Sequence, residues 1–130
     1  MFAMVNDVRI LHGWKPYYRR FDHVAQIRTD DMAARNYFGH QLPEGGTAYV
    51  AAARASGIFQ WDWLGENLAM NNYPDPVAEA MKGLMNSPTH RANILEPSAF
   101  DSLGIGVTKH PDGRWFFAQF FSGGVPWVLV

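Results

Sequence analysis

Apolar residues near the start of the chain recur at the spacing of a helix. Val5, Val8 and Leu11 predict a helix over residues 2–12, and Gly13 is a suitable residue to end it. Because an α-helix repeats every 3.6 residues, this spacing would place the three side chains on one buried face.

A second helix is predicted from Asp22, whose carboxylate can cap it, to Asn36. Its two faces differ in polarity, as expected for a helix that packs on a core. The pattern directs three apolar side chains inward: Val24, Ile27 and Met32. It directs four charged side chains toward water: Arg28, Asp30, Asp31 and Arg35.

Glycine and alternating polarity define the next two elements. Thr47 begins an alanine-rich helix that Gly57 ends. Residues 59–64 alternate well enough to form a strand or an extended segment. This segment leads directly into the sequence Gly65-Glu66-Asn67-Leu68-Ala69, which is therefore predicted to follow it.

Proline marks the start of two further helices. Asp75-Pro76 places a capping residue before a proline at the first helical position. Ser87-Pro88 repeats this arrangement and begins a short helical turn that carries His90. The first of these helices has an apolar stripe made of Val77, Ala80, Met81 and Leu84.

The end of the chain predicts an antiparallel hairpin. Residues 103–107 alternate large apolar residues with glycine, residues 110–113 form a turn, and residues 114–121 form a second strand that is apolar on both faces. Both faces of the sheet must then be covered by helices. The prediction is a single α+β domain over residues 1–130, folded as a three-layer α-β-α sandwich around a mainly antiparallel sheet.

Composition excludes several classes of protein. The 130 residues are 48% hydrophobic, which suits one packed domain and not a disordered chain. A net charge of −1 with scattered basic residues argues against a nucleic-acid partner. Without cysteine there is no disulfide, thiol nucleophile or zinc–thiolate site. No apolar run approaches the roughly 20 residues of a membrane-spanning helix, and residues 2–5 are too short for a signal-peptide core.

Separated segments of the chain carry a family resemblance. They are Asn6 with Arg9, then Asp31-Met32-Ala33 leading to Phe38-Gly39-His40, then Gly65-Glu66-Asn67-Leu68-Ala69, then Ser87-Pro88-Thr89-His90-Arg91-Ala92-Asn93-Ile94-Leu95, and the two closing strands. In this order they resemble the CAP superfamily of cysteine-rich secretory proteins, venom antigens and plant pathogenesis-related proteins. The lack of cysteine points to its bacterial branch. The resemblance implies an α-β-α sandwich and an extracellular or cell-surface location.

His40, Glu66 and His90 are the candidate site residues. Each is predicted at the edge of an element, where binding residues concentrate. Two imidazoles and one carboxylate suit zinc or another divalent cation and leave a position open to water. Their long, irregular spacing gives no support by itself. The resemblance adds that these positions line a central cleft, in which some relatives bind a divalent metal.

The family's second acidic position has no clean match in this chain. Ser87 stands where many relatives have the acid, and Glu79 lies two turns earlier. Leu84 replaces a tryptophan that is common in the same helix. The sequence therefore does not decide which residue, if either, would supply a second acidic ligand to a metal.

Each candidate also has a structural interpretation. His40 could end its helix and bond to a carbonyl, Glu66 could be a buried acceptor, and His90 could be a neutral packing residue. A nucleophilic triad of Ser87, His90 and Glu66 is rejected, because a serine before proline caps a helix and spends its oxygen on a backbone amide.

Three functions follow from these alternatives. The leading hypothesis is a binding module whose cleft holds a divalent ion and a peptide, lipid or cell-wall ligand. The second is a metal-dependent, protease-like hydrolase in which Glu66 acts as general base to a metal-bound water. The third is a structural domain with a vestigial cleft.

Overall fold

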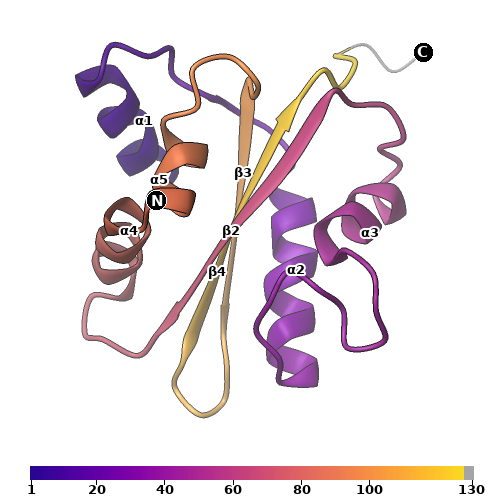
Figure 1. Ribbon diagram of the computed structural model, residues 1–130. Helices are drawn as coiled ribbons and strands as arrows, with labels where there is room; N and C mark the ends of the chain where they lie inside the picture. The colour runs from indigo at the N-terminus through magenta and orange to yellow at the C-terminus, as the bar shows by residue number, and fades with distance from the viewer. Residues whose placement is uncertain (128–130) are drawn as a thin grey trace.

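The computed structural model describes residues 1–127. In chain order its elements are α1 (Phe2–Leu11), β1 (Tyr18–Arg19), α2 (Asp22–Arg35), α3 (Ala48–Ala55), β2 (Trp63–Asn71), α4 (Pro76–Asn86), α5 (Pro88–Ile94), β3 (Ser102–Lys109) and β4 (Trp115–Gly123). Figure 1 shows α1, α4 and α5 on one side of the sheet and α2 and α3 on the other. The predicted three-layer α-β-α sandwich is confirmed.

The sheet is mainly antiparallel, as predicted. Its strand order is β1-β3-β4-β2, and only the two-residue β1 runs parallel to its neighbour β3. The predicted hairpin is formed by β3 and β4. Strand β2 lies at one edge of the sheet.

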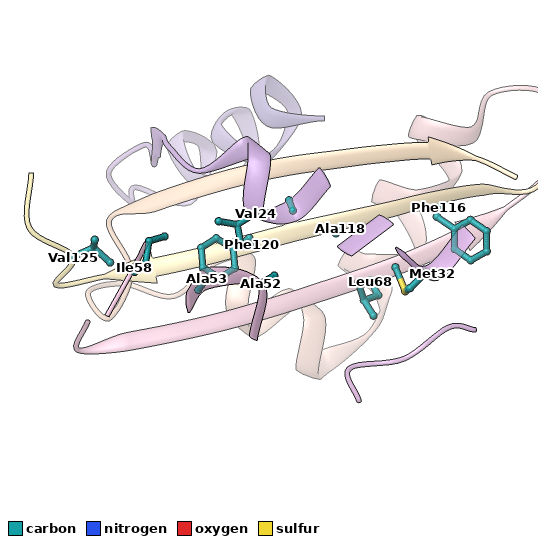
Figure 2. Close-up of a cluster of buried hydrophobic side chains, with 11 residues drawn as sticks. Val24, Met32, Ala52, Ala53, Ile58, Leu68, Phe116, Ala118, Phe120 and Val125 are labelled. Atoms are coloured by element: carbon teal, nitrogen blue, oxygen red, sulfur yellow. The ribbon is translucent and has the colours of Figure 1, made fainter. Parts of the chain in front are cut away.

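The core lies on both faces of β4. Phe116 and Phe120 pack with α2 and α3, in the cluster shown in Figure 2. Phe121 packs on the opposite face against α1, α4 and α5. All three rings are fully buried, which confirms the prediction that this strand is covered on both sides.

The glycines of β3 let α2 pack directly on the sheet. A Cβ atom at Gly106 would lie 2.3 Å from the backbone of Ala25, and one at Gly104 would lie 2.4 Å from the carbonyl oxygen of Phe21. No side chain fits at these distances. The alternation of large residues with glycine is therefore the sequence signature of this helix–strand contact.

Several predictions about α1 and α2 are wrong. Leu11 is 83% exposed and Ile27 is 42% exposed, whereas Arg28 is buried with 1% of its surface exposed. Asp22 does not cap α2, because the residue before the helix is Phe21. The Asp22 carboxylate instead accepts a hydrogen bond from the backbone N–H of Ile105 and pairs with Arg19.

Strand β2 lies later in the chain than the alternation of residues 59–64 predicts. It begins at Trp63 and continues to Asn71, so the Gly65–Ala69 segment lies inside the strand and not after it. The reason is pairing: every residue from Trp63 to Asn71 has a partner on β4. In the described part of the chain no helix is both long and apolar enough to cross a membrane.

Candidate functional site

Three different elements carry the candidate residues. His40 lies in the segment that follows α2, Glu66 lies within β2, and His90 lies in the first turn of α5. The His40 side chain is 47% exposed, whereas the Glu66 side chain is fully buried. His90 is partly buried. The prediction that Glu66 lies at the edge of an element is therefore wrong: Glu66 lies in the middle of β2, and its side chain points into the protein interior.

Glu66 is paired with two partners. The Arg28 Nε atom lies 2.9 Å from one carboxylate oxygen, Oε2, and the Arg28 Nη2 atom lies 3.3 Å from the other, Oε1. The His40 Nδ1 atom lies 2.9 Å from Oε1. Because a carboxylate only accepts hydrogen bonds, Nδ1 of His40 must carry the proton, which leaves Nε2 of a neutral ring as an acceptor.

Arg28 also holds the segment that carries His40. Its guanidinium donates to the Tyr37 hydroxyl at 2.8 Å and to the Gly39 carbonyl oxygen. Tyr37 in turn donates to Asp31, and burial together with this bond raises the pKa of Tyr37. One buried cation therefore links α2, β2 and residues 37–40.

Sequence reasoning missed Arg28 and placed it in water. A signal was present, since Val24, Arg28 and Met32 are four residues apart and share one face of α2. All three are buried. The apolar neighbours on either side indicate the true orientation better than the charge of Arg28 does.

His90 lies next to Ser87 and near His40. The Ser87 hydroxyl lies 2.7 Å from the His90 Nδ1 atom. Burial, and to a lesser extent the nearby His40 ring, lower the pKa of His90, which favours its neutral form. Figure 1 places α5, which carries His90, beside α4.

The predicted cap at Ser87 needs correction. Ser87 does occupy the position before α5, but its side chain makes no capping bond to a backbone amide and contacts the His90 ring instead. The rejected triad is not assembled, because the Glu66 carboxylate bonds to Arg28 and His40 while His90 bonds to Ser87.

Asparagines fix the start of α5 to the sheet. Asn67 donates to the His90 carbonyl oxygen and to Gln119, and Asn93 donates to Asn67. These bonds are 2.9–3.0 Å long, and Asn67 is fully buried. These hydrogen bonds give both asparagines a structural role.

A groove of about 360 Å³ runs between α4 and β2, and we call it the α4–β2 groove. It is lined by Phe38, Leu68, Ala69, Met70, Asn71, Tyr73, Glu79, Ala80, Gly83, Leu84, Ser87 and His90. Most of these side chains are apolar. Both residues considered for the second acidic position, Glu79 and Ser87, line it, whereas His40 and Glu66 do not.

The arrangement does not support the predicted metal set of His40, Glu66 and His90. Within residues 1–127, no group of three or more His, Asp or Glu is placed to hold a metal ion. Glu66 could not serve as an open ligand, because it is buried and both of its oxygens are bonded to protein. The interpretation of Glu66 as a buried acceptor fits the geometry.

Comparison with known proteins gives similarity along nearly the whole chain. Residues 2–121 match the family described as the cysteine-rich secretory protein family, CAP. The uncharacterized protein YkwD of Bacillus subtilis is 33% identical over 108 residues, which cover 82% of this chain and 40% of YkwD.

Solved structures are also similar to this chain over nearly its whole length. An extracellular protein of Bacillus anthracis that contains an SCP domain superposes with a TM-score of 0.79 and 31% identity, over 94% of this chain and 38% of that one. An outer surface protein of Borrelia burgdorferi superposes with a TM-score of 0.80 at 16% identity, over 95% and 89% of the two chains, which shows a shared fold. The chain spans about two fifths of the length of the two Bacillus proteins.

Proposed function

Since the chain belongs to the cysteine-rich secretory protein (CAP) family, we propose that it is an extracellular or cell-surface binding module whose α4–β2 groove holds the apolar part of an extended peptide. The location is supported by the Bacillus anthracis relative, which is described as extracellular. The lack of cysteine agrees with the bacterial members of the family.

The observation that carries the binding proposal is the composition of the groove. Its volume of about 360 Å³ is at the small end of the range for ligand sites, and it suits one or two apolar side chains. Met70, Phe38 and Tyr73 supply exposed apolar surface, whereas Leu68 and Leu84 also line the groove but are almost fully buried. A peptide is favoured because His90 and Asn71 add polar groups that can bond to a backbone.

The experiment uses ¹⁵N-labelled protein and NMR shift changes. The probes are acetylated tetrapeptides with a central Phe, Leu or Asp, a short-chain phosphatidylcholine and a soluble muropeptide. Peptides with Phe or Leu should shift the amides of residues 68–71 and 80–84, and the Asp peptide should not. Shifts produced only by the phospholipid or the muropeptide would contradict a peptide ligand and identify the other class.

A matched pair of variants tests the groove itself. Gly83 lines it, and a Cβ atom there meets nothing within 4 Å, so Gly83→Phe can fill the groove without a backbone clash. Lys82 is exposed on the same helix and does not line the groove. Gly83→Phe should abolish the peptide-induced shifts and Lys82→Phe should keep them. Equal effects of the two variants would contradict the proposal.

The geometry gives less support to a metal-dependent hydrolase. A general base must reach the proton that it removes, and the Glu66 carboxylate is buried and paired with Arg28. Peptide hydrolysis that is sensitive to a chelator and is lost in His90→Ala would favour the hydrolase over the binding module.

A further inference from the structure

We infer that Arg28 takes the place of a divalent cation in this chain: it supplies the positive charge beside Glu66 and closes the set of His40, Glu66 and His90 to a metal ion. Arg28 and Glu66 lie in the interior between α2 and β2, and neither lines the α4–β2 groove.

The carboxylate of Glu66 has no coordination site left toward solvent. Arg28 contacts both of its oxygens, and His40 occupies a further position on Oε1. The side chains of Arg28 and Glu66 are 2% and 0% exposed. A metal ligand needs an oxygen that faces an open site, and Glu66 presents none.

The charge of Arg28 cannot be switched off to admit a metal. A guanidinium stays protonated in proteins, so Glu66 could ligate a dication only by leaving a buried cation without its counter-charge. The dication would then lie close to that same guanidinium. Both effects oppose metal binding through Glu66.

Arg28 has further partners that keep it in place. Tyr37 and Gly39 accept hydrogen bonds from it, and it lies on the buried face of α2 between Val24 and Met32. An uncharged side chain of similar length at position 28 would leave the Glu66 carboxylate without a fixed positive charge. A divalent ion is the simplest replacement for the missing charge, and the His40 imidazole is the ring that already contacts this carboxylate, at 2.9 Å.

The test titrates Co²⁺ into the full chain and follows its visible absorption and the thermal unfolding midpoint. Wild type and Glu66→Gln should bind Co²⁺ equally, because Glu66 is not a ligand in either. Arg28→Met should bind Co²⁺ about 100-fold more tightly than wild type and gain stability from it. Arg28→Lys keeps the charge and should behave as wild type.

The double variant Arg28→Met/Glu66→Gln should lose the gain, which would assign it to Glu66. If Arg28→Met folds only when Co²⁺ is added, the inference is supported, and failure to fold even with Co²⁺ contradicts it. Weaker Co²⁺ binding by Glu66→Gln than by wild type would overturn it, since Glu66 would then ligate despite Arg28.

Discussion

Replacement of Glu66 by glutamine removes a buried charge while it keeps the shape of the side chain. Glu66 and Arg28 are 0% and 2% exposed, so the substitution leaves a guanidinium in the interior without a counter-charge. Breaking a buried ion pair in this way costs about 3–5 kcal/mol. The glutamine oxygen can still accept one hydrogen bond from Arg28, so we expect about 3 kcal/mol, a large part of the stability of a single domain.

Urea unfolding followed by circular dichroism measures this loss of free energy. The matched control is Glu44→Gln, which removes the same charge from a pair with Arg35 that is 57% exposed on the glutamate side. Water and salt screen an exposed pair, so the control should remain near wild type. A loss below about 1 kcal/mol for Glu66→Gln, or a loss equal to that of the control, would show that the buried pair stabilises the fold no more than an exposed pair does.

Three further predictions concern His90, the glycines of β3 and the cap of α4. Burial and a second imidazole lower the pKa of His90 below its ordinary value of 6.5. The contribution of the neutral His90 ring to the free energy of unfolding is therefore present above pH 6.5 and is lost as the pH falls through the folded pKa. The free energy of unfolding, measured in urea, should fall less on acidification in His90→Gln than in wild type. Gly106→Ala should cost about 3 kcal/mol or more by overpacking against α2, whereas Gly39→Ala, where a Cβ atom meets nothing within 4 Å, should fold normally; thermal melts compare the two. Asp75 caps α4 through a 3.2 Å bond to the amide of Ala78, so Asp75→Ala should lose about 1 kcal/mol in urea unfolding, and an unchanged midpoint would contradict the cap.

Local rules were enough to predict most of the fold. Proline after Asp75 and Ser87 starts α4 and α5 as expected, and alternation of large residues with glycine identifies β3. The errors lie where tertiary contacts override local pattern. Arg28 is buried because its partner comes from a strand 38 positions later in the chain, and helical periodicity contains no information about that partner.

The sequence identified His40, Glu66 and His90 as candidate residues, but it did not predict that Glu66 pairs with Arg28. The sequence left Glu66 open as either a metal ligand or a buried acceptor, and only the position of Arg28 distinguishes the two. Ser87 is a similar case. A serine before proline predicts a cap, but the nearness of the His90 ring offers its hydroxyl a second partner, which it takes.

The position of the hydrogen on the His40 ring shows directly whether Glu66 organises this site. Glu66, held by Arg28, should accept a hydrogen bond from Nδ1 of His40. Long-range ¹⁵N–¹H NMR at a pH where this ring is neutral should therefore show the Nδ1–H tautomer. An Nε2–H tautomer at His40 would contradict this arrangement, because Glu66 would then not be the acceptor that organises these residues.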